Sequence, residues 1–495
     1  PPRYTASSTL QRMELLKTGY MGTLSLGWDN YLFLELTGRQ ERSSTLKDQS
    51  FFYPSANLSF LFSNAFRMPA WWNHGKLRLS YGVVGNAPET YAANIIYEQG
   101  SDNGFTWNYV PSSWGNANIR PEKKYEYEIG FESKFLNNRL GFDVSYYNNR
   151  VKDQILSTPQ PSTSGVKYVL MNVGEVANEG WDISVSATPV LTKNFRWDLT
   201  ANYGIYRNKV VKLADGVPYL EISNIGGGGA KIQAVEGRPM GDIYVQVPQM
   251  NENGEYLVSD KGLYMNQTEL QRVGNINPDG VGGLFSSFSY KNIFLDFSID
   301  FRIGGDVINE MYQYSTASGL TPESLQFRDT EHGGLSYYYP GNNNASGVPV
   351  QVDPSLGAGP NGETVYHDGV ILPGVVASTG EKNTRIIPAG YYYNQTYNWG
   401  TQPEQLTYRH SVFDNSYVKL RELTIGYQFP EKLISKLGMT RLSVSVFGRN
   451  LFYFYKALKN YDAESSVGTS WASQAVVGGS TTATRNFGVS LRASF

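Results

Sequence analysis

The residue types that most often carry catalysis are scarce and scattered in this 495-residue chain. Cysteine is absent, which excludes disulfides and thiolate metal sites. The four histidines, His74, His332, His367 and His410, lie far apart, and neither a HExxH zinc motif nor a GxSxG nucleophile motif is present. The sequence therefore predicts no catalytic residue, no bound metal and no cofactor, and we expect a protein that is not an enzyme.

Two short stretches match ligand-binding loops only in part. "GGGG" at 226–229 lacks the lysine of a phosphate-binding loop, and "NENGE" at 251–255 has an incomplete series of calcium ligands. A flexible loop and a plain turn are the better interpretations.

Aromatic side chains are the residues best suited to contact a ligand. The chain has 36 Tyr, 24 Phe and 9 Trp, and several stand beside Asn or Gln in "FTWNYV", "SYYYPG" and "YYYNQTYNWG". Rings stack on sugar faces or grip peptide side chains, while the amides pair with hydroxyls or peptide groups. We predict contact with a substrate or a covering partner for Trp107, Tyr337, Tyr338, Tyr339, Tyr391, Tyr392, Tyr393 and Trp399. The alternative is that these rings pack the loops against one another.

The elements that must position these residues are strands. At the end of the chain, Phe487, Val489, Leu491, Ala493 and Phe495 alternate with small or polar residues, and the same period of two recurs along the sequence. We predict thirteen strands at approximately 19–28, 31–39, 55–62, 76–83, 125–134, 140–151, 179–188, 196–210, 283–290, 293–303, 417–429, 441–451 and 486–495.

Charge and hydropathy exclude two classes of protein. Lys plus Arg (42) nearly balance Asp plus Glu (44), so the excess of positive charge that nucleic-acid binding requires is missing. No apolar run approaches the ~18 to 20 residues of a membrane-spanning helix. An outer-membrane β-barrel remains allowed, because its alternating strands need only ~9 to 11 residues each.

The predicted connections alternate in length, which favours a membrane barrel over a soluble β-sandwich. Short links follow the odd-numbered strands, whereas the intervening links are longer and rich in Gly, Asn, Ser, Tyr and Pro. A membrane barrel has short periplasmic turns and long outer loops. We therefore expect extracellular loops at about 84–124, 152–178, 211–282, 304–416 and 452–485 in an all-β, antiparallel transmembrane barrel.

Thirteen strands leave two edges. If the last strand runs toward the periplasm, the first also does, so a single-chain barrel cannot close from these strands alone. An open edge in lipid would leave backbone groups unpaired at several kcal/mol each. We therefore expect another chain segment to complete the wall.

Several ordered motifs resemble the C-terminal half of SusC/RagA-type TonB-dependent transporters. They span nearly the whole chain. They are "GNANIRPEKKYEYEIGFES" (115–133), "NVGEVANEGWDISV" (172–185), "VEGRPMGDIYV" (235–245), "VGNINPDGVGGLFSSFSYKNIFLDFSIDFRIGGDVIN" (273–309), "YVKLRELTIGYQFPEKLISKLG" (417–438) and "LSVSVFGRNLFYFYKALKNYDAE" (442–464).

The resemblance implies a 22-stranded barrel in which this chain supplies strands 10 to 22, with the plug domain absent from this chain. It implies as partners the N-terminal part of the barrel and plug, TonB in the periplasm, a SusD-like surface lipoprotein acting as lid, and outer-membrane lipid. It also implies that Phe495 is the aromatic signal read by the barrel-assembly machinery. The charged residues Glu126, Glu128, Asp296, Asp300 and Arg302 would face the lumen, where they contact the plug or are solvated by water.

The resulting expectation is TonB-dependent import of oligosaccharides or peptides across the outer membrane of a Gram-negative bacterium. The alternative from another class is a non-transporting SusC-like subunit of a larger outer-membrane assembly. A passive porin comes third, because the resemblance points to a plugged wall.

Overall fold

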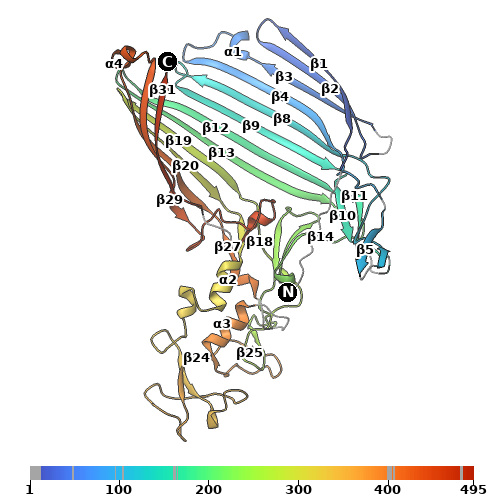
Figure 1. The fold of residues 1–495 in the computed structure, drawn as a ribbon, viewed down its shortest axis with the longest axis vertical. Coiled ribbons are helices and arrows are strands. Elements are labelled where there is room, and N and C mark those ends of the chain that lie inside the picture. Colours follow the sequence, from blue (N-terminus) through green and yellow to red (C-terminus); the bar gives the residue numbers. More distant parts are fainter. Residues whose placement is uncertain are drawn as a thin grey trace.

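The computed structural model describes residues 13–46, 50–94, 96–102, 105–159, 163, 165–398, 404, 407–479 and 483–495. Its main feature is one antiparallel sheet of thirteen strands (Figure 1). In order across the sheet, these strands are β1 (Lys17–Trp28), β2 (Leu32–Ser43), β3 (Ser50–Phe60), β4 (Trp72–Asn86), β8 (Glu122–Phe135), β9 (Leu140–Lys152), β12 (Glu175–Leu191), β13 (Phe195–Lys212), β19 (Gly280–Tyr290), β20 (Ile293–Ile303), β28 (Tyr417–Gln428), β29 (Arg441–Lys456) and β31 (Asn486–Ser494).

The thirteen predicted strands are confirmed, and the observed ones are mostly longer. The strand predicted at 293–303 has the same bounds in the structure, whereas β4 extends from 72 to 86 instead of 76 to 83. Pairing continues where alternation fades, because a neighbouring backbone still offers partners: Asn86, at the end of β4, pairs with Glu122 of β8.

The register separates polar and apolar side chains onto two faces. Residues directly opposite in an antiparallel pair project to the same side. One row of the more polar face crosses eight strands through Arg78, Gly130, Ser145, Asp182, Gly204, Val281, Arg302 and Tyr417, of which only Gly130, Gly204 and Val281 lack a polar side chain. The adjacent apolar row contains Leu77, Phe131, Val144, Ile183, Tyr203, Gly282, Phe301 and Val418.

The apolar face is open to the surroundings. Leu79, Ile129 and Trp181 lie in the middle of it and are 45% to 50% exposed. A contiguous exposed surface of this kind is unfavourable in water but suits contact with hydrocarbon.

The two ends of the sheet differ. Figure 1 shows the short turns, the one-turn helices α1 (Phe62–Ala65) and α4 (Glu431–Ile434), and the C-terminal end of the chain at one end of the sheet. Tight turns there use left-handed residues, such as Asp29 and Asn30 with φ of 45° and 57°. The longer connections leave from the opposite end, except that β2 and β3 are joined there by residues 44–49 alone.

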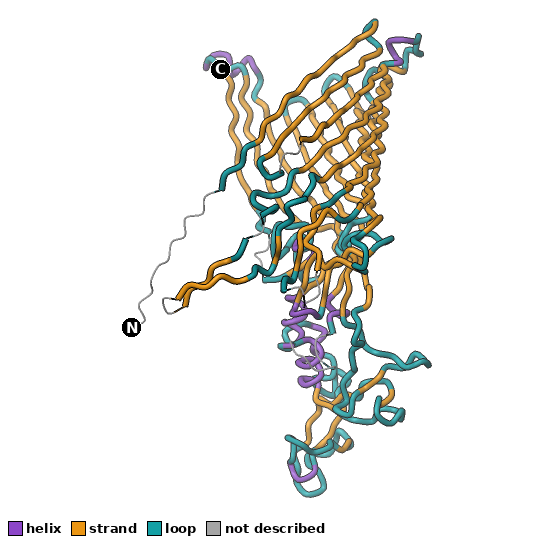
Figure 2. The backbone as a smooth tube through the Cα atoms, turned by 90° about the vertical axis from the view of Figure 1, so that its right-hand side faces the viewer, coloured by secondary structure: helices purple, strands orange, loops and turns teal. Residues whose placement is uncertain are grey.

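The long connections fold into smaller sheets and helices that extend away from the main sheet (Figure 2). Their strands are β5 (Glu98–Asp102), β6 (Phe105–Tyr109), β7 (Ser113–Trp114), β10 (Ile155–Pro159), β11 (Tyr168–Asn172), β14 (Tyr219–Ile225), β15 (Ala230–Val235), β16 (Asp242–Val245), β17 (Leu257–Val258), β18 (Gln271–Asn275), β21 (Asp306–Asn309), β22 (Leu335–Tyr338), β23 (Val350–Gln351), β24 (Val365–Val370), β25 (Val375–Val376), β26 (Ile387–Pro388), β27 (Val412–Asp414) and β30 (Val476–Val477). Their helices are α2 (Glu310–Ala317), α3 (Ala389–Tyr397) and the 3-10 turns η2 (Gly226–Gly228), η3 (Pro322–Leu325), η4 (Pro340–Asn342), η5 (Tyr408–Ser411) and η7 (Ser473–Ala475), while η6 (Ser435–Leu437) follows α4 in a short turn.

The largest buried core lies in these connections. Ile232, Ile243 and Val245 pack with Ile308 and Tyr408, and each is at most 1% exposed. Helices in the described part of the chain are too short and polar to cross a membrane.

Candidate functional site

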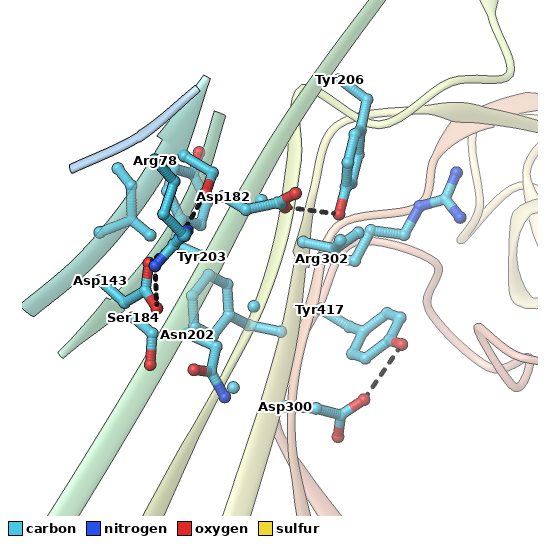
Figure 3. A pocket seen from close by; sticks show the side chains of 17 residues that line it. Arg78, Asp143, Asp182, Ser184, Asn202, Tyr203, Tyr206, Asp300, Arg302 and Tyr417 are labelled. Atoms are coloured by element: carbon cyan, nitrogen blue, oxygen red, sulfur yellow. Dashed lines mark hydrogen bonds and ion pairs between the residues drawn. The ribbon is translucent and has the colours of Figure 1, made fainter. Parts of the chain in front are cut away.

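A hollow of about 630 Å³ lies on the polar face of the sheet (Figure 3). Side chains from β4, β9, β12, β13, β19, β20 and β28 line it. Seven strands can border one hollow only if the sheet curves toward that side, and Figure 2 shows this curvature. The polar face is therefore concave and the apolar face convex.

Ion pairs and hydrogen bonds between neighbouring strands hold the side chains of this hollow. Arg78 Nη2 donates to Asp143 Oδ1 at 2.6 Å and to Ser145 Oγ at 3.0 Å. The Tyr206 hydroxyl donates to Asp182 Oδ1 at 3.1 Å (Figure 3). Such paired groups give the inner wall polar contacts without leaving an isolated charge.

A second charged network ties the last connection, residues 457–485, to the inner wall. Arg421 of β28 donates through Nε to Asp300 Oδ1 at 2.9 Å and through Nη2 to Glu464 Oε1 at 2.6 Å. The buried ammonium of Lys419 also bonds to Glu464, and the Tyr417 hydroxyl donates to Asp300 at 3.3 Å. Glu464 therefore fastens its connection against β28.

The five charged residues predicted for the lumen lie on the concave face by register. Glu126 accepts from Asn149 Nδ2 at 3.1 Å, Glu128 lines a neighbouring hollow, and Asp296 accepts from Ser287 Oγ at 2.6 Å. Asp300 belongs to the Arg421 network. Arg302 donates to the carbonyls of Ile276 and Gly304 at 3.0 and 3.1 Å, so it holds the backbone at the base of two connections. Their contact with a plug stays a prediction.

Sequence reasoning missed Arg78, Asp143, Asp182, Arg421 and Glu464 as site residues. A signal was available for the first three, because each occupies a polar position in an alternating strand. The pairing of Arg421 with Glu464 depends on how the last connection folds back, which local sequence patterns do not determine.

The aromatic residues predicted to contact a substrate or lid fall into different environments. Trp107, on β6, is 48% exposed. Tyr337, Tyr339 and Tyr393 are buried in clusters of the long connection, and the Tyr393 hydroxyl donates to the carbonyl of Glu323 at 2.8 Å. For these three rings the structure favours the alternative of loop packing. Tyr338, Tyr391 and Tyr392 are partly buried, whereas Trp399 lies outside the described residues.

The remaining sequence interpretations have mixed outcomes. Phe495 follows β31 and is 82% exposed, and its role as an assembly signal stays a prediction. The plain turn at 251–255 is confirmed, because Asn251 Oδ1 accepts from the backbone N–H groups of Asn253 and Glu255 at 3.0 Å.

The flexible loop predicted for "GGGG" is instead the turn η2, where a Cβ on Gly226 (φ 59°) would stand 1.8 Å from the Tyr408 hydroxyl. In the described ranges, no group of three or more acidic or histidine side chains could hold a metal ion.

Polar side chains are also buried where the long connection folds. Burial raises the pKa of Glu310, although the Tyr408 hydroxyl donates to it at 3.3 Å. Burial and the neighbouring Arg409 lower the pKa of His410, whose ring lies 5.5 Å from that of Tyr397. Both shifts favour the neutral forms in this connection.

A curved antiparallel sheet with an apolar convex face, a polar concave face, short turns at one end and folded connections at the other is the wall of a membrane β-barrel. Residues 4–243 match the family model described as "TonB dependent receptor-like, beta-barrel". TonB-dependent receptor P3 of Formosa agariphila is 22% identical over 90% of this chain and 42% of its own length. SusC of Bacteroides thetaiotaomicron, another TonB-dependent receptor, is 27% identical over 45% of this chain and 24% of its own.

Among solved structures, the RagAB peptide transporter has the same fold, with a TM-score of 0.69 at 18% identity over 97% of this chain and 48% of that one. These matches identify the sheet as part of a TonB-dependent receptor-like β-barrel that is similar to those of the SusC/RagA type. It spans about half the length of the RagAB chain and less than half of the curated relatives.

Proposed function

We propose that this chain forms the C-terminal part of an outer-membrane transporter that imports oligosaccharides or peptides with energy delivered through TonB. The observation that carries the proposal is the division of one curved sheet into an apolar convex face and a polar, ion-paired concave face. The likeness to SusC, and to a structure described as a peptide transporter, supports import as the activity.

In this proposal each region has a distinct task. The convex face contacts lipid, and strands supplied by the rest of the protein pair with β1 and β31, so that no backbone edge is left in hydrocarbon. The concave face surrounds a plug and the substrate path. The folded connections lie outside, where a SusD-like lipoprotein covers them and substrate is captured.

Energised uptake is the direct test. In the native bacterium, deletion of the gene should abolish growth on, or uptake of, one class of oligosaccharide or peptide, and loss of TonB should have the same effect. Native mass spectrometry of the complex extracted from membranes should show a SusD-like chain. If deletion instead disrupts other outer-membrane proteins without affecting uptake of any nutrient, the structural-subunit alternative replaces this proposal.

Contact between the wall and a plug has its own test. Reversing the charge of Asp296 and Asp300 together should loosen the plug and raise single-channel leak in planar bilayers, because the lumen would lose two negative contacts. Glu381→Lys, at an exposed position of the long connection, is the matched control. Unchanged leak and plug retention would contradict the contact.

A further inference from the structure

A second hollow, of about 580 Å³, lies where the inner face meets the connections. It is bordered by the β4–β8 connection, residues 87–121, and by β10 and β11. β11 pairs with β7 of that connection, so the two connections form one unit beside the ends of β4 and β8 (Figure 1). The volume is within the range of sites for small ligands. We call this hollow the mouth cavity.

The floor of the mouth cavity is apolar. Ile155 and Leu170, from β10 and β11, line it and pack on a cluster built from the buried residues Leu46, Phe51 and Ile119. Trp114 and Tyr91 add aromatic surface to the wall. The apolar part of a ligand can therefore pack on this floor, and no polar group of the ligand has to be buried there without a hydrogen bond.

The described side chains that line the mouth cavity and carry a full charge at neutral pH are all carboxylates. These are Glu89, Glu98 and Glu122, and none of the described lining residues is Lys, Arg or His. Glu122 is fixed by the backbone N–H of Ile155 at 2.8 Å and by Asn86 Nδ2 at 3.3 Å. Three carboxylates beside an apolar floor produce a negative potential that favours a cation.

Nearby basic side chains are engaged elsewhere. Arg120 Nη2 bonds to Asp153 Oδ1 at 2.8 Å, and Lys124 Nζ lies 2.5 Å from Glu126 Oε2. Neither Arg120 nor Lys124 lines the mouth cavity, so neither side chain neutralises its carboxylates from within the lining.

The mouth cavity continues into the inner wall. Asn86 and Glu122 form a register pair on the polar face, and Glu126 and Glu128 follow on the same face of β8. These two glutamates line a third hollow, which shares Asp182 and Tyr206 with the hollow in Figure 3. A charged group that leaves the mouth cavity along the wall therefore meets Glu126 and Glu128, with Lys124 and Arg207 beside them.

We propose that the mouth cavity binds a positively charged group on an apolar body, such as the lysine or arginine side chain of an oligopeptide. The carboxylates attract the cation, the rings of Trp114 and Tyr91 favour it further, and the apolar floor holds the rest of the ligand. This assigns cationic peptides as a substrate class. As a statement about import it rests on the proposed function, whereas binding at the cavity does not.

The test compares two probes that differ by one charge, applied to the full-length protein purified with its associated chains. N-acetyl-Phe-Lys-amide carries one ammonium group, and N-acetyl-Phe-norleucine-amide has a similar shape without it. Calorimetry should show at least roughly tenfold tighter binding of the lysine probe, weakening between 50 and 500 mM salt. Equal affinities would overturn the proposal, as would maltotriose competing with the lysine probe at similar affinity.

Variants locate the binding. Glu89→Gln with Glu98→Gln, both exposed positions, should weaken the lysine probe by about two- to fivefold per carboxylate and leave the norleucine probe unchanged. Glu122→Gln, which keeps an acceptor for Ile155, should have a similar effect. Glu381→Gln is the control. No change in the Glu89/Glu98 and Glu122 variants would exclude this cavity.

Failure of this proposal and failure of the import proposal can be told apart. Binding measured on purified protein needs no TonB, so it is unaffected if the gene proves dispensable for uptake. Conversely, uptake that depends on the gene but shows no preference for cationic peptides would leave import standing and remove the cavity as its selector.

Discussion

The thirteen-stranded sheet and the connections at its mouth have opposite burial patterns. In the sheet, Leu79, Ile129 and Trp181 expose nearly half of their surface on the convex face. In the connections, Ile232, Ile243 and Tyr408 are almost completely enclosed. The sheet is therefore a single layer, stabilised by backbone hydrogen bonds between strands and by the medium that contacts its convex face. The connections are instead small globular units with their own cores.

This difference shows that one chain is adapted to two solvents. Apolar side chains turned outward are stable only where the solvent is hydrocarbon, and closed hydrophobic clusters are stabilised by water. The boundary falls at the ends of the strands, where Arg302 and Arg421 contact the connections.

The strongest test of this comparison removes volume from the enclosed core. Ile243→Ala should destabilise the connections by about 2 to 5 kcal/mol, because the cluster around Ile243 cannot fully collapse. Limited proteolysis of the protein in its membrane should then cut within 213–279 and 304–416 while the sheet stays resistant. Leu79→Ala on the convex face is the control and should leave the connections intact. Loss of the whole sheet in Ile243→Ala would show that the two regions are not independent.

The second test places a charge on each face of the sheet. Ile129→Arg, at the centre of β8 on the convex face, should cost about 2 to 4 kcal/mol, the range for a cation near the middle of the bilayer. Ser80→Arg, on the concave face opposite Glu128, should be tolerated. Urea unfolding in lipid vesicles measures both. A larger effect for Ser80→Arg would reverse the assignment of the two faces.

The sheet could be predicted from the sequence because its pattern is local. Because apolar and polar residues alternate with a period of two, every strand of the sheet could be located, and both ends of the strand at 293–303 were predicted correctly. The turn between β8 and β9 is local as well: Asn137 and Asn138 adopt left-handed conformations, with φ of 58° and 62°. Strand ends were less accurate, since pairing outlasts alternation.

The connections could not be predicted in the same way, because distant segments hold them together. Ile308 pairs with Val476 in a parallel bridge, and the Tyr408 ring occupies the space left by Gly226. Neither contact has a local signature. The same limit explains why Tyr337 and Tyr393, which look like exposed loop aromatics in the sequence, are buried.

The contact between the two regions is tested at Arg421. Arg421→Ala removes hydrogen bonds to Asp300, Glu464 and Asn450, and should cost about 1 to 2 kcal/mol because the site is partly exposed to solvent. Hydrogen exchange should increase in 457–485 with little change in β20. Arg449→Ala, which removes the more exposed pair with Glu422, is the matched control and should have a smaller effect. Equal effects would mean that Arg421 does not fasten the connection.

The smallest expected effect is a pH dependence confined to the connections. The folded pKa of His410 is lowered by burial and Arg409, so the unfolded state binds more protons below its usual value of about 6.5. The free energy of unfolding of this region should therefore decrease as the pH falls from about 6.5 toward the lower folded pKa of His410. Glu310 acts in the opposite direction: its folded pKa is raised, so its stabilising contribution is lost as the pH rises above about 4.5 and returns as the pH falls. The net loss at pH 5.5 should be less than about 1 kcal/mol. Hydrogen exchange of α3 and η5 at pH 7.5 and 5.5, corrected for intrinsic rates, should show less protection at the lower pH. His410→Gln should remove this decrease and Glu310→Gln should enlarge it, while the strands of the sheet stay unchanged in both variants. A pH response of the sheet equal to that of α3 would show that His410 is not its cause.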